Sequence, residues 1–575
     1  MLKRLIRQLI GSGVSAGSPV AEPEPEPSLP QALELMRARD YAGAVQLCEA
    51  LIARDAAAPG PWKLLGAIAL ERGEKELACE RFETALGLAG ERLHAICNAA
   101  EANRQAGRHA RALELSARAL ALDPGYGPAM YSQALTLQSC WRTDEALAVY
   151  RRLVQRQPDL SQACAGYLFL MLLLGEDPLL VRAAHCRWAE ANAEPLRERG
   201  AGYANAPDPL RRLRIGYVSA DFREHAASSF VEPILAAHDP SGFEIYCYSS
   251  AEKIDATTAQ LRGLATYWRD LRWQSDEAVA GMIRADAIDI LVDLSGHTNG
   301  NRLGVFARKP APVQLTYLGY PATTGMSAMD YRLTDALLDP PGVADGYYTE
   351  RLLRLPHSLW CFRPPASMPE PGPLPALHSG QVTFGSFNSM LKLRPQMIAL
   401  WSRLLLSVPH SRLLLAAIPA GWARERITAE FARHGVPVAR LGMHEPMELQ
   451  RFWDLHAQVD IALDSYPYNG GATTCAALWL GVPVVSLAGD IFQSRAGLSL
   501  LSAIGLPELV AQSESGYLRI ARELALDRER LSQLRLGLRQ RMRGSPLLDE
   551  GGFTRALEAL YRGAWRHWCE EVPHA

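Results

Sequence analysis

Two patterns of hydrophobic and polar positions divide this chain. Up to about residue 175, apolar and small residues recur with the spacing of amphipathic helices. From Leu213 onward, short continuous apolar runs alternate with helical segments. Continuous apolar runs are typical of strands that are buried on both faces, as in parallel sheets covered by helices. The pattern therefore predicts an α-helical part followed by an α/β part.

The helical part contains an internal repeat with a fixed interval of 34 residues. The interval recurs at buried-type alanines (Ala44, Ala78, Ala112, Ala146), at turns (Gly73, Gly107, Trp141, Gly175), at small residues between helices (Gly66, Ala100, Ala134) and at helix ends (Pro124, Pro158). A helix-turn-helix unit of this length resembles the tetratricopeptide repeat. We expect repeats over residues 31–176 that stack into a superhelix with a concave binding face. An unrelated helical bundle would not explain the fixed interval.

The apolar runs of the α/β part predict two series of strands, separated by the proline-rich segment 364–375. The predicted strands are 214–219, 289–296 and 313–319 in the first series, and 382–387, 411–416, 459–463 and 482–487 in the second. Two series predict two lobes, residues 211–370 and 380–575, joined to the repeats by a helical segment, 177–210. Ligands of such sheets bind at the carboxyl ends of the strands, so we expect a site in the crevice between the lobes.

Composition narrows the function classes. A chain of 575 residues is too long for one core, and its formal charge of −2 gives no reason to expect nucleic acid or an anionic membrane as partner. The ten cysteines are scattered without a C-x-x-C pair, which suits a reducing cytoplasm. No cluster of His and Cys has metal-ligand spacing and no convincing D-x-D loop occurs, so we expect no metal cofactor.

Residues 1–30 form a separate N-terminal segment. Residues 1–10 are basic and amphipathic, and 21–30 are acidic and proline-rich, which indicates an extended linker. The segment lacks the continuous apolar core of a signal peptide, and we find no later stretch long enough to span a membrane. We expect a frayed N-terminal helix, with contact to a membrane surface or a partner as the alternative.

The stretch 460–489 is the most informative part of the chain. A buried strand leads to Tyr468-Asn469-Gly470-Gly471, where small residues let backbone approach a ligand, and a helix follows from Thr473 to Leu480. The first turn of a helix offers unpaired N–H groups to an anion, here beside the hydroxyls of Thr473 and Thr474. We interpret this turn as a phosphate site; an ordinary β-α-β unit with a tight turn is the alternative.

Two further residues could carry chemistry. His225 follows the first strand of the first lobe, where a side chain faces the crevice, and a histidine there could take a proton from an acceptor hydroxyl. Lys392 follows the first strand of the second lobe and could stabilise a departing diphosphate. The alternatives are a loop or capping histidine and a solvated lysine.

Two more strand-end loops extend the predicted rim of the site. His297 and Thr298 follow the strand 289–296, and Tyr320, Pro321 and Thr324 follow the strand 313–319. Polar residues and glycines at successive strand ends favour a shared site at this edge of the sheet.

Several motifs together resemble one family. These motifs are similar to those of the O-GlcNAc transferases and the related SPINDLY family. They are R-I-G-Y-V-S-A-D-F-R-E-H, D-L-S-G-H-T, L-G-Y-P-A-T-T-G, F-G-S-F-N and D-S-Y-P-Y-N-G-G-A-T-T-C. These proteins couple tetratricopeptide repeats to a two-lobed GT-B catalytic region with two Rossmann-like folds. The resemblance runs from about residue 31 to the end, and its later motifs lean towards SPINDLY.

The resemblance implies an inverting, metal-independent transfer of one sugar from a nucleotide sugar, with UDP-GlcNAc as the leading donor, to Ser or Thr of a protein. It implies that His225 is the base and that Lys392 contacts the donor diphosphate. It places Ser389, Asn469, Gly470, Gly471, Thr473 and Thr474 in the donor site. The repeats would bind the protein acceptor. The oligomeric state stays open.

Some positions depart from the family pattern. Ala476 stands where relatives carry an acidic residue that binds the ribose, and Phe452 stands where many carry a histidine against the base. Gly471 and Ala472 replace a histidine and a threonine. Two alternatives therefore remain: the same scaffold with GDP-fucose or UDP-glucose as donor, and a non-catalytic repeat adaptor with a degenerate transferase domain. Retention of His225 and Lys392 argues for the enzyme.

Overall fold

The computed structural model describes residues 27–198 and 202–571. These residues belong to two compact units, one that ends at Arg156 and one that begins at Gln157. The basic N-terminal stretch and most of the predicted acidic linker, up to residue 26, lie outside the described residues.

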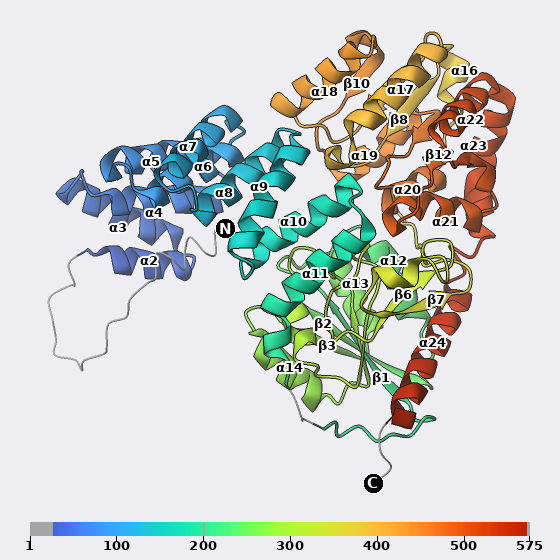
Figure 1. The fold of residues 1–575 in the computed structure, drawn as a ribbon, viewed down its shortest axis with the longest axis horizontal. Helices are drawn as coiled ribbons and strands as arrows, with labels where there is room; N and C mark the ends of the chain where they lie inside the picture. The colour runs from blue at the N-terminus through green and yellow to red at the C-terminus, as the bar shows by residue number, and fades with distance from the viewer. Residues whose placement is uncertain (1–26, 199–201, 572–575) are drawn as a thin grey trace. The chain divides into compact units, whose positions relative to one another are not determined.

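The first unit is built from consecutive helices that pack against their neighbours along the chain (Figure 1). Within the described residues these are α2 (Leu29–Arg37), α3 (Tyr41–Arg54), α4 (Pro59–Glu71), α5 (Lys75–Ala89), α6 (Leu93–Gln105), α7 (His109–Leu122), α8 (Gly127–Ser139) and α9 (Thr143–Arg156). The predicted helical repeat, with its superhelix of the tetratricopeptide type, is confirmed.

Steric contacts explain why the repeat keeps small residues at a fixed interval. Ala44, Ala78 and Ala112 are completely buried. A Cβ atom added to Gly66 would lie 2.8 Å from the ring of Phe82, so α4 and α5 could not approach as closely with a larger residue. The turns after the first helix of each pair use the left-handed region, with φ of 76° at Gly73, and Trp141 adopts it with φ of 57°.

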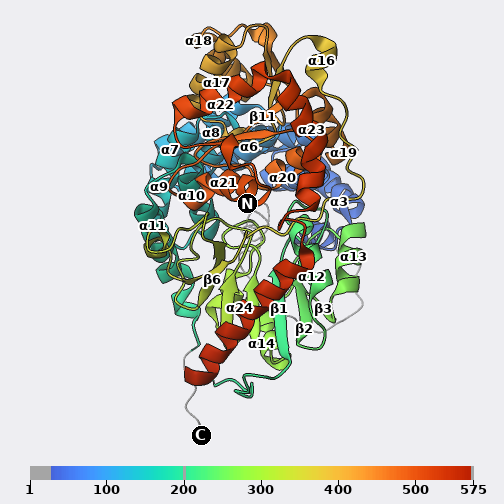
Figure 2. The same ribbon diagram turned by 90° about the vertical axis from the view of Figure 1, so that its right-hand side faces the viewer.

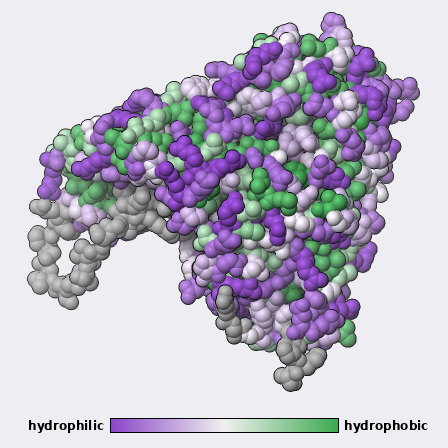
Figure 3. Space-filling model, viewed as in Figure 1, coloured by the Kyte–Doolittle hydropathy of each residue, from purple (hydrophilic) through white to green (hydrophobic). Residues whose placement is uncertain are grey.

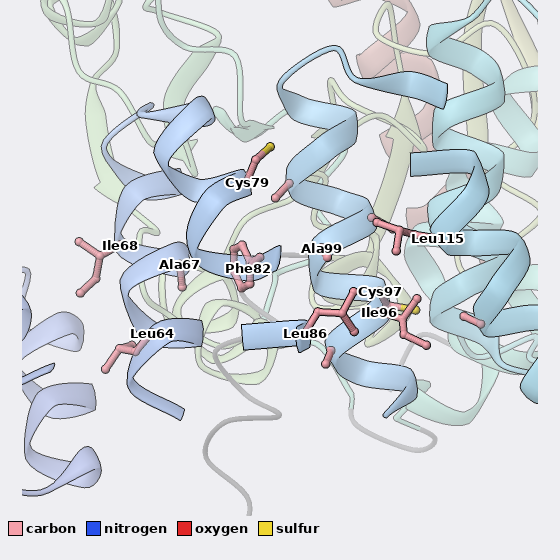
Figure 4. Packing of buried hydrophobic residues seen from close by; sticks show 14 of the residues in the cluster. Leu64, Ala67, Ile68, Cys79, Phe82, Leu86, Ile96, Cys97, Ala99 and Leu115 are labelled. Carbon is pink, nitrogen blue, oxygen red and sulfur yellow. The ribbon is translucent and has the colours of Figure 1, made fainter. Parts of the chain in front are cut away.

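Apolar side chains from successive helices form the core of this unit. In Figure 4, Leu64 and Ile68 from α4, Phe82 from α5, Ile96 from α6 and Leu115 from α7 belong to one buried cluster. Each helix pair thus buries its apolar face against its neighbours, which is how stacked repeats gain stability.

The second unit begins with two helices, α10 (Ser161–Leu174) and α11 (Pro178–Asn192), before the first lobe. The lobe contains a seven-stranded sheet with the order β3-β2-β1-β4-β5-β6-β7, in which all pairs are parallel. Its strands are β1 (Leu213–Ser219), β2 (Phe243–Ser249), β3 (Tyr267–Asp270), β4 (Ile290–Asp293), β5 (Val313–Thr316), β6 (Tyr331–Asp335) and β7 (Arg351–Leu355). Its helices are α12 (Ser228–Ala237), α13 (Ala256–Leu264), α14 (Asp276–Ala285) and α15 (Leu303–Ala307), with 3₁₀ turns η1 (Glu194–Leu196) and η2 (Ala344–Tyr347).

The second lobe repeats this arrangement with a six-stranded parallel sheet, in the order β10-β9-β8-β11-β12-β13. Its strands are β8 (Thr383–Ser386), β9 (Arg412–Leu415), β10 (Leu441–Met443), β11 (Ile461–Leu463), β12 (Val484–Leu487) and β13 (Val510–Ala511). Its helices are α16 (Pro375–Ser379), α17 (Pro395–Ser407), α18 (Trp422–Arg433), α19 (Leu449–Asp454), α20 (Ala472–Trp479), α21 (Ala496–Ala503), α22 (Glu514–Leu526) and α23 (Arg528–Arg543). The 3₁₀ turns are η3 (Met390–Lys392), η4 (Val438–Arg440), η5 (Leu455–Gln458), η6 (Phe492–Ser494) and η7 (Pro507–Leu509).

The last helix, α24 (Glu550–Glu571), returns to the first lobe, as Figure 2 shows beside β1. It packs against α12, β5 and β7. Its buried Tyr561 hydroxyl lies 3.1 Å from that of Tyr217 on β1. Sequence order alone had assigned residues 380–575 to the second lobe, because nothing in a local pattern says that a helix packs on a distant sheet.

The strand orders decide where a site can form. In each sheet the chain order reverses once, between β1 and β4 and between β8 and β11. Loops after these strands diverge to opposite faces and leave a crevice at the carboxyl ends. All seven predicted strands are confirmed, and the two-lobed α/β fold with them. The sequence reading did not single out β2, β3, β6, β7, β10 and β13.

The surface drawn in Figure 3 is mostly hydrophilic, with hydrophobic residues in small groups. Among the helices of residues 27–198 and 202–571, none combines the length and the apolar character that a membrane span requires.

Candidate active site

A cavity of about 590 Å³ lies between the two lobes of the second unit. The first lobe lines it with the loop before α12 and with α12 and α13, and the second lobe lines it with α19 and the start of α20. The segment that joins the lobes forms a third wall. The polar and aromatic lining residues include Glu224, His225, Glu232, Gln260, Arg363, Phe452, Trp453 and Thr473.

His225 lies in the loop between β1 and α12, on the cavity wall. Its Nδ1 is 3.7 Å from Asp221 Oδ1 and accepts a 3.3 Å hydrogen bond from the N–H of Ala227. Burial lowers the pKa of His225; the carboxylate of Asp221 opposes this shift, and the guanidinium of Arg223 adds to it. The ring is therefore neutral near pH 7, the form that accepts a proton.

Local hydrogen bonds close this loop. The Ser228 hydroxyl donates to the carbonyl oxygens of Arg223 at 2.6 Å and Asp221 at 3.1 Å, and the N–H of Glu224 donates to Asp255 at 2.9 Å. The His225 side chain is nevertheless 41% exposed. The loop presents an imidazole whose ring is open to a ligand in the cavity.

The turn after β11 is held more tightly. The Asn469 side-chain amide donates to Ser465 O at 2.8 Å, and the Gly470 N–H donates to Asp464 Oδ1 at 2.7 Å. Helix α20 then begins at Ala472, one residue before the predicted start. Its first N–H groups have no carbonyl one turn earlier within the helix, so they can bind an anion.

The two glycines of this turn lie in close protein contacts, tighter at Gly470 than at Gly471. A Cβ atom on Gly470 would lie 2.5 Å from Thr473 Oγ1 and 2.7 Å from Thr474 Oγ1. A Cβ atom on Gly471 would lie 3.2 Å from the ring of Trp360, which packs against the turn. The sequence analysis attributed these glycines to close approach of a ligand. The structure adds a second reason at Gly470, where a side chain would collide with both threonine hydroxyls.

Lys392 lies six residues after the end of β8, at the end of η3. Its ammonium donates to the carbonyl of Asn469 at 2.8 Å and lies 4.3 Å from the centre of the Tyr468 ring. Burial lowers the pKa of Lys392 to about 8, and the Asp464 carboxylate opposes that shift. Lys392 thus contacts the turn 469–474, although it is not among the residues that line the 590 Å³ cavity.

The segment after β8 also holds the turn through an amide. Asn388 Oδ1 accepts a 3.0 Å hydrogen bond from the Thr473 hydroxyl, which lines the cavity. Thr474 donates to Gly470 O at 3.1 Å. Ser389 accepts a 3.4 Å bond from Leu391 N–H and borders a separate small hollow. The structure therefore joins Asn388 and Lys392 to the turn after β11, whereas the predicted donor residue Ser389 does not line the 590 Å³ cavity.

The predicted rim residues lie elsewhere. None of His297, Thr298, Tyr320, Pro321 and Thr324 lines the cavity. His297, Tyr320 and Thr324 are buried. His297 Nε2 lies 2.9 Å from Thr324 O, so two of these residues contact one another outside the cavity lining.

Helix α11 explains this burial. The ring of its Trp188 lies 4.4 Å from that of His297, and its His185 Nε2 lies 2.9 Å from the Tyr320 hydroxyl. A Cβ atom on Gly325 would lie 2.4 Å from the backbone of His185, so the glycine lets the helix approach. The sequence pattern could not show that a helix before the lobe covers these strand ends.

The sequence reading missed three residues that shape the site. Asp464, inside the quoted D-S-Y-P-Y-N motif, accepts hydrogen bonds from the turn. Trp360 packs on Gly471. Arg363 lines the cavity and donates to Glu232 and Glu550, each at 2.8 Å. Of the three, only Asp464 could have been found from the sequence, because it is a carboxylate at the end of an apolar strand.

Within residues 27–198 and 202–571, no three His, Cys, Asp or Glu side chains gather in a way that could hold a metal ion. The expectation of a metal-free site remains a prediction.

Comparison with known proteins identifies the family. The profile described as Glycosyl transferase family 41 matches residues 201–362 and 375–557. The chain belongs to this family. The match covers both lobes, including His225, Lys392 and the turn 469–474.

Relatives in family 41 include plant proteins of the SPINDLY type. The chain is 41% identical over 377 residues to a protein of Petunia hybrida named as a probable UDP-N-acetylglucosamine–peptide N-acetylglucosaminyltransferase SPINDLY, and 40% identical over 429 residues to its Solanum lycopersicum counterpart. These matches cover 64% and 72% of this chain. The chain spans only 40% and 45% of the lengths of those relatives.

A solved structure is similar over nearly the whole chain. An O-GlcNAc transferase mutant from Thermobaculum terrenum superposes with a TM-score of 0.81 at 36% identity, covering 90% of this chain and 99% of that one. The likeness supports the combination of helical repeats with a two-lobed transferase region.

Proposed function

We propose that this chain is a protein O-glycosyltransferase that moves a single sugar, with GlcNAc from UDP-GlcNAc as the leading donor, to Ser or Thr of a protein. One observation carries the proposal. A single cavity is lined by a histidine of one lobe, His225, and by the first turn of a helix in the other, at Thr473. A base and an anion site that face one cavity are what a sugar transfer requires.

In the proposed reaction the acceptor hydroxyl attacks the anomeric carbon of the donor sugar. The hydroxyl oxygen forms the new bond, the bond to the diphosphate breaks with its electron pair, and His225 takes the hydroxyl proton. Attack opposite the leaving group inverts the anomeric carbon. The N–H groups at the start of α20 and the Lys392 ammonium stabilise the departing diphosphate without a metal.

The ionisation states agree with these roles. Burial keeps the pKa of His225 below the usual histidine value, which leaves the ring able to accept a proton at neutral pH. The pKa of Lys392, lowered by burial to about 8, leaves the ammonium mostly charged at pH 7 in the empty protein. An anionic diphosphate would raise that pKa on binding.

The nucleoside would lie against the second lobe. Phe452 and Trp453 offer aromatic surface on the cavity wall, and Ala476 lines it with a methyl group. Ala476 cannot hydrogen-bond a ribose, a loss of about 1.5–3 kcal/mol relative to a carboxylate there. The ribose is common to all three nucleotide sugars, so Ala476 does not choose among them. The SPINDLY-like motifs of the second lobe keep a second candidate, the same reaction with GDP-fucose or UDP-glucose as donor.

The protein acceptor would bind the repeats of the first unit, since stacked repeats of this kind present a concave binding face. We place the reaction in the cytoplasm, because all ten cysteines are free thiols and nine of them are buried.

The test is a donor panel. Purified chain is incubated with UDP-GlcNAc, UDP-glucose and GDP-fucose, and released nucleoside diphosphate and the mass of an acceptor protein are measured. Preference for one donor, lost in Lys392→Ala, supports the transferase and names the sugar. Binding of none of the donors would refute it and favour the repeat adaptor without catalysis.

A further inference from the structure

We propose that Asp464 is a positioning residue for the diphosphate site, because it holds the amide of Asn388 and the N–H of Gly470, and the carbonyl of that same peptide, on Asn469, accepts from Lys392. The inference rests on the proposed function, in which this turn receives the diphosphate. Asp464 does not itself line the cavity, so it acts through these groups.

Asp464 contacts residues at the ends of three strands, β8, β11 and β12. It follows β11 and is only 2% exposed. Its Oδ1 accepts from the N–H groups of Ser465 at 2.9 Å and Gly470 at 2.7 Å, and from Asn388 Nδ2 at 3.1 Å. Its Oδ2 accepts from the Ser486 hydroxyl on β12 at 2.8 Å.

These contacts call for the ionised carboxylate. Burial raises the pKa of Asp464, but the hydrogen bonds from Gly470 and Ser486 and the charge of Lys392 oppose that shift. The three partners of Oδ1 are N–H groups, which can only donate, so Oδ1 must act as an acceptor. The Ser486 hydroxyl, which can donate or accept, donates to Oδ2 in this structure. Gly497 completes the enclosure, since a Cβ atom there would lie 3.0 Å from Oδ2.

Asp464 also sets the position of a hydroxyl on the cavity wall. Because the Asn388 amide nitrogen donates to Asp464, its carbonyl oxygen is turned to Thr473 and accepts the 3.0 Å hydrogen bond from that hydroxyl. An amide has only these two ends. The carboxylate therefore fixes Thr473 at the first turn of α20 through one intervening residue.

The charge of Asp464 acts on Lys392 as well. The other groups against the ammonium, the Asn469 carbonyl and the Tyr468 ring, carry only partial charges. Burial lowers the pKa of Lys392 and Asp464 alone is found to raise it, so loss of this carboxylate lowers the pKa below about 8. More of the lysine would then be neutral at pH 7–8, where it must stabilise a leaving diphosphate.

The test is Asp464→Asn, which keeps the size of the side chain and removes its charge. We expect kcat/KM for the preferred donor to fall on the order of 100-fold, as for a small misplacement of a binding group. We also expect the basic limb of the pH profile, set by Lys392, to move to lower pH. The matched control is Ser486→Ala, which removes one hydrogen bond to the same carboxylate but keeps its charge and should leave the basic limb in place.

A folded Asp464→Asn variant with an unchanged basic limb and unchanged kcat/KM would overturn the assignment. Should that variant not fold, Asn388→Ala keeps the carboxylate and breaks the link to Thr473. The affinities of Asn388→Ala and wild type for UDP and GDP are then compared with their affinities for the nucleosides uridine and guanosine. Weaker binding of the diphosphate with unchanged binding of the nucleoside supports the assignment; equal effects on both overturn it. A wild-type chain that binds no nucleotide would instead refute the proposed function itself.

Discussion

Each lobe has a carboxylate near a basic side chain that we assign to the reaction: Asp221 near His225 in the first lobe and Asp464 near Lys392 in the second. The surroundings of the two carboxylates differ. In the first lobe, Asp221 lies 3.7 Å from a His225 ring that is 41% exposed. In the second, Asp464 is 2% exposed and accepts from the N–H of the Asn469–Gly470 peptide, and Lys392 donates to the carbonyl of the same peptide. The Asp221–His225 pair is partly open to solvent, which screens its interaction, whereas the buried Asp464 and Lys392 interact at a lower effective dielectric.

The difference fits the two tasks that we propose. A base that meets hydroxyls on many protein acceptors gains from an open, adaptable position. A site for a diphosphate, the part that UDP-GlcNAc, UDP-glucose and GDP-fucose have in common, gains from being fixed before the ligand arrives. The contrast predicts that, between matched groups, the change in the second lobe costs more: Lys392 more than His225, and Asp464 more than Asp221.

The largest effect is expected from Lys392→Ala. Removing a cation that neutralises a leaving diphosphate should reduce kcat by about 10³–10⁵-fold, the size seen when a cation at a transferring phosphoryl group is removed. Steady-state transfer measures it, with circular dichroism as the check on folding and Lys392→Arg as the control that keeps the charge. Unchanged transfer by a folded Lys392→Ala chain would remove the role assigned to this lysine.

The second largest loss of activity is expected from His225→Ala. Loss of a general base costs about 10²–10⁴-fold in rate. Because His225 works as the neutral ring and burial lowers its pKa, wild-type activity should fall only below the usual histidine range, as pH drops. Nucleotide affinity, measured by calorimetry, should stay unchanged. A loss of affinity equal to the loss of rate would place His225 in donor binding instead.

Thr473→Ala tests a single contact of the rigid turn. It removes the 3.0 Å bond to Asn388, and a neutral hydrogen bond contributes about 0.5–1.5 kcal/mol, so diphosphate affinity should fall about 2- to 10-fold. Thr473→Ser retains the hydroxyl and should bind as wild type does. If both variants bind equally weakly, the methyl group rather than the hydroxyl matters.

The smallest effect is expected from Asp221→Asn. An exposed ion pair contributes about 0.2–1 kcal/mol, which corresponds to about 0.1–0.7 of a pH unit. Since Asp221 raises the pKa of His225, its neutralisation should move the acid limb of the activity profile to lower pH by that amount. A shift as large as that of Asp464→Asn on the basic limb would show that the two pairs are equally buried in solution, against the comparison.

Much of the candidate site could be predicted from local sequence patterns. His225, Lys392 and the turn from Asn469 to Thr474 were predicted because strand ends, glycines and the start of a helix are written in adjacent residues. The rim residues show the limit: His297 and Tyr320 follow buried strands as the turn does, yet α11 covers them, and contacts such as that of Trp188 with His297 join residues more than a hundred positions apart.

The sequence by itself determined the repeat interval, the parallel strands and the residues that end them, because helix and strand periods and glycine turns are local properties. The tertiary structure decided which strand ends remain open, that α24 returns to the first lobe, and that Asp464 sits where β8, β11 and β12 converge. Those outcomes depend on side-chain packing and burial between distant segments, which no local pattern encodes.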